Sequence, residues 1–319
     1  MTDPIKKYLL YVGGVKRYSS RTQALYKEIL EEFAAFTEPE DIVRSLNTSI
    51  LRSYEVWLMD EKKLGARTVG LHLSVLSGFC RWLVSQGALN SNPVRTLPRP
   101  KVEKRLPVFY REENMDEYFT QTALYGSDEV LKLFSGKPGD KADARLYENI
   151  LNRLIISILY STGIRRSELI GLNRSSYDSH RKVLHVRGKG DKMREIPLTE
   201  TICEEILLYL RAIDKMGIEA EETAFPLLLT RSGKRLYPVF VDRAVKEELG
   251  GVPEITSRKS PHVLRHTLAT ELLDEGTDLN SIKELLGHSS LAATQVYTHN
   301  SIEKLKKVYK NAHPRAAKK

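Results

Sequence analysis

The chain has 319 residues, a formal net charge of +9 and an isoelectric point near 9.3. This length allows about two domains of ordinary size, and the only cysteines, Cys80 and Cys203, exclude a disulfide framework and a Cys-x-x-Cys metal site. The first residues lack the apolar stretch of a signal peptide and the densest apolar run, residues 154–160, is too short to cross a bilayer, so we expect a soluble, cytoplasmic protein.

The first third of the chain has the pattern of a helical domain. Apolar residues recur at helical spacing in residues 22–36, 49–61 and 66–87, with polar breaks between them. Residues 1–105 contain 17 Lys and Arg against 11 Asp and Glu. Such an excess is typical of a surface that binds a polyanion such as DNA, although basic charge also serves solubility alone. We predict a helical N-terminal domain over residues 1–92.

Residues 93–108 are rich in proline and basic side chains, which predicts an interdomain linker. A cationic linker could wrap a DNA duplex, and a solvated spacer fits the same composition. The four prolines that prevent a continuing helix are Pro93, Pro98, Pro100 and Pro107.

Residues 109–311 are predicted to form a second domain, followed by a basic tail at 312–319. Within it, residues 119–145 have the character of an insertion, and a buried helix is expected over 147–163. Residues 182–198 change to β-branched and apolar residues around a Gly-Lys-Gly-Asp turn, which predicts a hairpin. Helices then return, with Ser260 as an N-cap and Gly276 and Gly287 as helix ends. The fold class is therefore mainly α with a small β-sheet.

His262 and His266 lie four residues apart on a predicted helix, a spacing that zinc sites also use. A zinc hydrolase of this type needs a glutamate after the first histidine, but position 263 is Val, and Arg265 would place a fixed cation beside the metal. Zinc is thus disfavoured. A core histidine beside a surface arginine is the simplest interpretation of this stretch taken alone.

Taken together, four stretches carry the groups that metal-free chemistry on a phosphodiester requires. Arg165 and Arg265 could neutralise the non-bridging oxygens, because planar guanidinium groups bind them in pairs. Lys189, on the predicted turn, could protonate the leaving oxygen, and Tyr297 could attack the phosphorus once a cationic pocket favours its phenolate. The four stretches are residues 161–172, 186–192, 260–270 and 285–299.

In these stretches the chain resembles the tyrosine recombinases of the integrase superfamily, most closely the Xer-type site-specific recombinases. The motifs TGIRRSEL, GKGDK, SPHVLRH, LLGHSSL and TQVYTH follow the order of that family over nearly the whole length. The resemblance implies a SAM-like core-binding domain before a catalytic domain. It also implies chemistry without a cofactor, ATP or a metal. It implies a phosphate-activating set with an accessory glutamate and a tyrosine nucleophile: Arg165, Lys189, His262, Arg265, His288, Glu168 and Tyr297.

Neighbouring residues offer alternatives to several of these assignments. Arg166 lies one position too late in the motif, and Lys192 is the alternative to the turn lysine. His288 also fits a simple helix cap. We expect His266 and His299 to be structural or supporting, since the implied set is complete without them. Tyr309, by contrast, shares an apolar helical stripe and should serve packing.

The resemblance implies cutting and rejoining of duplex DNA through a 3′-phosphotyrosine and a Holliday junction. The implied partners are a double-stranded recombination site, a tetramer of this chain alone or with a paralogous recombinase, and an activating DNA translocase. Chromosome-dimer resolution on nucleoid DNA is the favoured role, and the alternative is an integrase or invertase of a mobile element. A helix-turn-helix binding protein, suggested by residues 279–297, leaves Arg165 and Lys189 unexplained. A type IB topoisomerase would relax plasmids without site preference.

Overall fold

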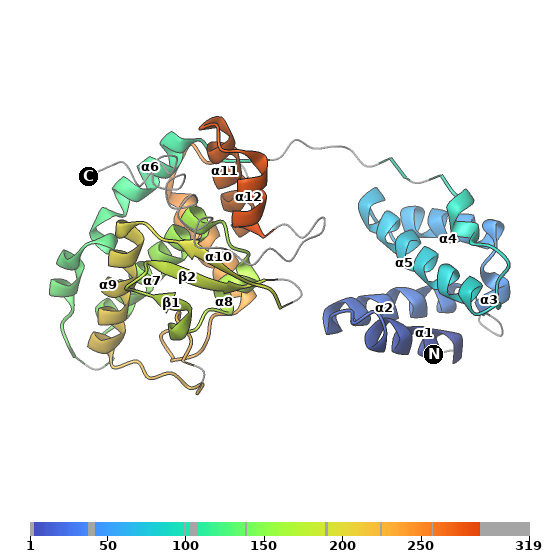
Figure 1. Cartoon of the computed structure of the whole chain (residues 1–319), viewed down its shortest axis with the longest axis horizontal. Helices are drawn as coiled ribbons and strands as arrows, with labels where there is room; N and C mark the ends of the chain where they lie inside the picture. The colour runs from blue at the N-terminus through green and yellow to red at the C-terminus, as the bar shows by residue number, and fades with distance from the viewer. Residues whose placement is uncertain are drawn as a thin grey trace. The chain divides into compact units, whose positions relative to one another are not determined.

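The computed structural model describes residues 3–37, 42–98, 100–101, 108–137, 139–188, 191–223, 225–256 and 258–287. The chain divides into two compact units, Met1–Arg105 and Leu106–Lys319 (Figure 1). No helix in these ranges is long and apolar enough to span a membrane.

The first unit is helical, as the spacing of its apolar residues predicts. Ser19 and Asn47 begin two of its helices by accepting backbone N–H groups through their side chains. The helices enclose an aromatic core that includes Phe33, Tyr54 and Phe79. They are α1 (Asp3–Gly14), α2 (Ser20–Phe36), α3 (Ile42–Ser45), α4 (Thr48–Asp60) and α5 (Ala66–Ser85).

The packing of this unit continues into the segment predicted as a linker. The Asn92 side chain donates to the carbonyl and the hydroxyl oxygens of Ser77 at 3.1 and 2.9 Å. A short 3₁₀ helix follows, η1 (Pro93–Thr96), and Val94 and Leu97 are buried in the core of the first unit. The domain limits at 92 and 108 stay predictions, but the core of the first unit reaches Leu97.

The second unit is built around a long central helix, α7 (Lys141–Thr162), against which α9, α10 and α11 pack. A three-stranded antiparallel sheet in the order β1-β2-β3 contains the predicted hairpin, in which Val186 pairs with Arg194. The mainly α class with a small sheet is confirmed. The strands are β1 (Tyr177–Asp178), β2 (Val183–Arg187) and β3 (Met193–Pro197). The remaining helices are α6 (Glu112–Gln121), η2 (Ala123–Gly126), η3 (Asp128–Leu133), α8 (Arg166–Ile170), η4 (Arg174–Ser176), α9 (Glu200–Met216), α10 (Pro238–Glu248), η5 (Leu249–Gly251), α11 (Pro261–Asp274) and α12 (Leu279–Leu286).

The end of α7 is set by a glycine at the point where three elements meet. Gly163 adopts a left-handed conformation (φ 60°), which lets the chain reverse directly after the helix. A Cβ atom there would lie 2.5 Å from a methyl group of Leu286 and 3.0 Å from one of Leu268. The missing side chain therefore allows α12 and α11 to approach the end of α7.

The segment expected as an insertion, residues 119–145, is built into the core of the second unit. Val130 and Leu131 are buried in that core. The buried Arg153 of α7 donates to the Phe119 carbonyl and pairs with Glu205 of α9, both at 3.1 Å. Because a buried guanidinium needs these acceptors, the segment and the helices stabilise one another.

A buried carboxyl group lies between α7 and α11. The hydroxyl of Tyr160 donates to Oε1 of Glu271 at 2.9 Å, while Oε2 is buried with no hydrogen-bond partner in the described residues. Burial raises the pKa of Glu271 to about 7, and the carboxylates of Glu112 and Asp116 add to that rise. The protonated form is therefore the one that the fold favours.

The raised pKa predicts a pH-dependent stability. The contribution of Glu271 is complete below the unfolded pKa of 4.5 and is lost as pH rises through about 7. We expect Glu271→Gln to raise the Tm above that of the wild type by roughly 5 °C at pH 8, and hardly at pH 5. Thermal unfolding at both pH values measures this. Glu275→Gln, at the exposed end of the same helix, is the control, and an equal shift at both pH values would contradict the prediction.

Candidate active site

Arg165 lies at the start of α8, directly after the turn at Gly163 and Ile164. Its Nη1 donates to Oε1 of Glu168 at 2.7 Å, and its Nη2 donates to the carbonyl of Gly287 at 2.9 Å. The backbone N–H of Arg165 also donates to Oε2 of Glu168 at 2.9 Å. The side chain of Arg165 is 29% exposed and that of Glu168 is 4% exposed. The buried carboxylate therefore holds a guanidinium that is in part open to solvent.

Arg265 extends from α11 and is buried. Its Nη1 donates to the carbonyl of Gly163 at 2.5 Å, and its Nη2 donates to the carbonyl of Leu286 at 2.6 Å. Burial lowers the pKa of Arg265 to about 10, and the charge of Arg165 adds to this effect. The group remains a cation at neutral pH. Within the described residues, Arg165 and Arg265 each use two of five N–H donors, which leaves donors for an anion.

Arg194, on β3, completes the cluster and was not among the predicted site residues. Its Nη1 and Nη2 donate to the two oxygens of Glu168 at 3.2 and 2.8 Å, and its Nε donates to the carbonyl of Leu285 at 3.0 Å. The strand pattern contains a signal for Arg194. Residues two apart in a strand share a face, so Arg194 lies on the same buried face of β3 as Ile196. An arginine in an inward position needs a buried partner.

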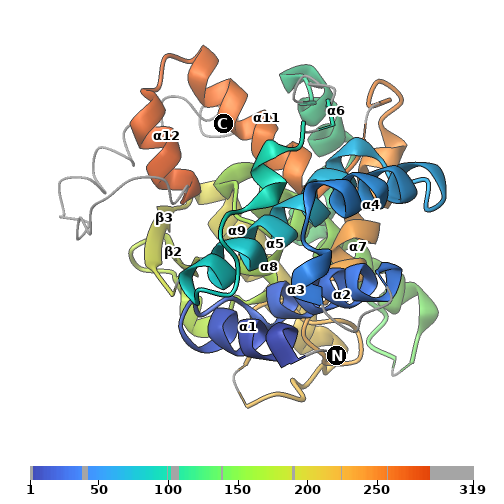
Figure 2. The same cartoon turned by 90° about the vertical axis from the view of Figure 1, so that its right-hand side faces the viewer.

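The three arginines therefore bind three successive carbonyls at the end of α12, those of Leu285, Leu286 and Gly287. The end of a helix presents unpaired carbonyls and partial negative charge, which cations stabilise. The helix stops because Gly287 turns into the left-handed region (φ 65°). This contact places α12 beside β3 and α11 (Figure 2).

The cluster carries a surplus of positive charge. Arg165 and Arg194 pair with a single carboxylate, Glu168, whose charge also acts on Arg265. Burial alone would raise the pKa of that carboxyl, but hydrogen bonds from Arg194 and Arg165 outweigh burial and hold the pKa below its usual value. Because Glu168 stays ionised and cancels one of the three charges, the cluster attracts anions.

His262, at the start of α11, is exposed. Burial of its ring lowers its pKa, and the charges of Arg166, His266 and Arg265 lower it further. The imidazole is therefore neutral at neutral pH in the absence of DNA. Arg166 pairs with Asp242 of α10, so the structure joins Arg165 and not Arg166 to Glu168.

Three of the predicted site residues, Lys189, His288 and Tyr297, lie outside the described residues, as do His299 and Tyr309. The residues before the first two are described. A Cβ atom on Gly188 or on Gly287 would lie 3.3 or 3.1 Å from the same Arg194 nitrogen, Nη1. Gly188 and Gly287, the last described residues before Lys189 and His288, therefore both lie close to the guanidinium of Arg194. Among the described residues, no group of three or more His, Cys, Asp and Glu side chains could hold a metal ion.

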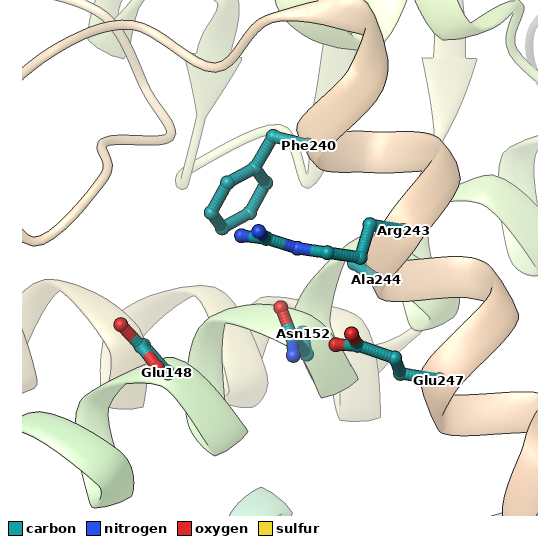
Figure 3. Close-up of a pocket in the computed structure, with 6 residues that line it drawn as sticks. All are labelled: Glu148, Asn152, Phe240, Arg243, Ala244 and Glu247. Atoms are coloured by element: carbon teal, nitrogen blue, oxygen red, sulfur yellow. The ribbon is translucent and has the colours of Figure 1, made fainter.

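A separate depression of about 340 Å³ lies between α7 and α10, and the arginine cluster takes no part in its walls. The guanidinium of Arg243 lies over the ring of Phe240, 5.4 Å from its centre (Figure 3). The side chains that line it come from both helices: Glu148, Asn152, Phe240, Arg243, Ala244 and Glu247.

Comparison with known proteins agrees with this architecture. Residues 141–304 match the model of the Phage integrase family, and residues 5–87 match the model described as Phage integrase, N-terminal SAM-like domain. The tyrosine recombinase XerC of Chlorobaculum parvum is 32% identical over 323 residues, which cover 98% of this chain and 94% of the relative. The XerC of Bacillus subtilis is 32% identical over 321 residues, covering 99% and 97%.

Two solved structures share the fold. The Tn1549 transposon integrase in complex with circular intermediate DNA has a TM-score of 0.65 at 20% identity, covering 94% of this chain and 97% of that chain. The XerH site-specific recombinase bound to the palindromic difH substrate has a TM-score of 0.63 at 18% identity, covering 96% and 83%. The chain belongs to the phage integrase family of tyrosine recombinases. It is an enzyme of site-specific DNA recombination.

The electrostatics of the cluster predict how His262 titrates. Because the charge of Arg166 lowers the pKa of His262, we expect Arg166→Gln to raise the midpoint of its titration toward the ordinary value. NMR titration of the imidazole protons measures this, with His262→Gln for assignment. Arg243→Gln removes an arginine that is not among the causes of the shift and should leave the midpoint in place. An unchanged midpoint in Arg166→Gln would contradict the prediction and show that the charge of Arg166 does not contribute to the shift.

Proposed function

We propose that this enzyme cuts one DNA strand at a time by attack of Tyr297 on the scissile phosphate. The observation that carries the proposal is the cluster of Arg165, Arg194 and Arg265 around Glu168, because its surplus charge suits a phosphodiester. The cluster also lies at the end of α12, where Gly287 comes one residue before His288 and ten residues before Tyr297 in sequence.

In the proposed step, Tyr297 reacts as a phenolate, having already lost its proton; its oxygen forms a bond to phosphorus, and the bond from phosphorus to the 5′ oxygen breaks. Lys189 gives that oxygen a proton, so the products are a 3′-phosphotyrosine and a free 5′-hydroxyl. The free donors of Arg165 and Arg265 neutralise the non-bridging oxygens, with His262 and His288 as further donors. Attack by a 5′-hydroxyl of the partner strand reverses the chemistry, joins the strands and yields a Holliday junction.

The proposal includes the setting of the reaction. The relatives named XerC match almost the whole chain at 30–34% identity, which supports a Xer-type role in resolving chromosome dimers in the cytoplasm, on nucleoid DNA. The partners would be a double-stranded recombination site, three further recombinase subunits, identical or paralogous, and an activating translocase. The step as written uses no cofactor, ATP or metal. Integration or inversion of a mobile element is the alternative role.

The test is recovery of covalent adducts. The protein and a Tyr297→Phe variant are incubated with sheared genomic DNA of the source organism, denatured in detergent, and the attached DNA is sequenced. Adducts at one chromosomal locus that vanish in the variant support the proposal. Adducts at mobile-element ends or invertible segments favour the alternative role. If DNA binds and even a nicked suicide substrate traps no adduct, the covalent mechanism is wrong.

The two adjacent arginines allow a matched comparison. Arg165→Lys loses the paired donors that reach Glu168 and Gly287, so we expect the rate of adduct formation on a nicked substrate to fall by about 10²–10³-fold. Arg166→Lys, whose parent residue pairs with Asp242 on the surface, should cut at close to the wild-type rate. Single-turnover kinetics with saturating protein measures both. The reverse order would assign the catalytic role to Arg166.

A further inference from the structure

Arg194 is not among the residues assigned to the catalytic set, yet its guanidinium makes three hydrogen bonds within the cluster. It binds both oxygens of Glu168 and the Leu285 carbonyl, and it is almost fully buried. Its guanidinium also lies against the backbone at Gly188 and Gly287. Arg194 therefore contacts α8 through Glu168 and α12 through Leu285, and it lies close to the hairpin at Gly188.

We propose that Arg194 is a positioning residue of the recombination reaction, which holds Glu168, and through it Arg165, in one frame with the hairpin and the end of α12. The inference rests on the proposed function, because that function gives Arg165, Lys189 and His288 their roles. The hairpin carries Lys189, and α12 leads to His288. Arg194 thus connects Glu168, and through it Arg165, with the described ends of the hairpin and of α12 at Gly188 and Gly287.

The contacts require an arginine. A guanidinium is planar and presents donors on three nitrogens, so Nη1, Nη2 and Nε can bind two carboxylate oxygens and a carbonyl at the same time. A lysine ammonium is a single point of charge and cannot span these acceptors. Substitution by lysine would keep the charge of the cluster and lose its geometry, which separates the two contributions.

A purely structural role for Arg194 can be distinguished by comparison with Arg153. Arg153 and Glu205 form a second buried ion pair in the same unit, with side-chain exposures of 7% and 3% against 6% and 4% for Arg194 and Glu168. Arg153 binds the segment at Phe119 and has no contact with the cluster in the described structure. Breaking a buried ion pair leaves the other charge without compensation and is destabilising, so a change in either arginine should cost a similar amount of stability. Only the loss of Arg194 should alter the chemistry.

The kinetic test compares Arg194→Lys with Arg153→Lys on a nicked suicide substrate. The final yield of covalent adduct gives the fraction of protein molecules that are active. The rate constant of adduct formation describes only those active molecules. We expect Arg194→Lys to lower the rate constant by about 10²-fold, since a displacement of about 1 Å in an active site has an effect of this size. Arg153→Lys should change only the melting temperature and the final yield. A wild-type rate constant in Arg194→Lys would overturn the proposal.

A double substitution tests whether Arg194 acts through Glu168. If the two residues work as one unit, Glu168→Gln combined with Arg194→Lys should be no slower than the slower single variant. Rate losses that multiply would show independent action and would overturn the proposed route. Arg194→Met provides the same comparison with the positive charge removed.

Hydrogen exchange of the DNA-free protein tests the positioning without any catalysis. Arg194→Lys should speed amide exchange in α12 and α8, whereas Arg153→Lys should speed it in α6 and η2. Unchanged exchange in α12 and α8 would overturn the positioning role whether or not the wild type forms an adduct. If exchange changes as expected and the wild type forms no adduct, the positioning stands and the proposed covalent function fails.

Discussion

The catalytic unit depends on the attraction between three arginines and the carbonyl end of one short helix. α12 has eight residues, too few to be stable alone, and its last three free carbonyls lie at one point of the fold. Arg165, Arg194 and Arg265 approach that point from α8, β3 and α11, and Glu168 reduces their mutual repulsion. The positions of α8, β3 and α11 are therefore all set relative to the same few atoms.

The central helix α7 provides the surroundings in which such a cluster is possible. Its last half is buried on all sides, which excludes water and strengthens the nearby charge interactions. Its end at Gly163 supplies a carbonyl for Arg265 and admits Leu286 at close range. Another buried arginine, Arg153, fixes the end of α6 to the same helix through the Phe119 carbonyl.

Sequence patterns predicted the helices and the hairpin, and they named Arg165 and Glu168 as residues of one site, because local spacing and short motifs determine these features. They did not predict Arg194, whose partners lie 26 and 91 residues away along the chain. Sequence patterns also did not predict the raised pKa of Glu271, because that shift depends on how α7 and α11 pack around the carboxyl group. The motif also could not show that the carbonyls at the end of α12 bind Arg165 and Arg265. The assignments of Lys189, His288 and Tyr297 stay predictions.

The hydrogen bonds from Arg165 and Arg265 to backbone carbonyls have a consequence for the energetics of DNA recognition. A free arginine side chain loses about 2 kcal/mol of rotamer entropy when it is ordered. Here the carbonyls of Gly163, Leu286 and Gly287 already restrict both side chains before any ligand arrives. The entropic cost of ordering these side chains is therefore met when the protein folds. Binding of DNA to them would then lose less free energy to side-chain ordering.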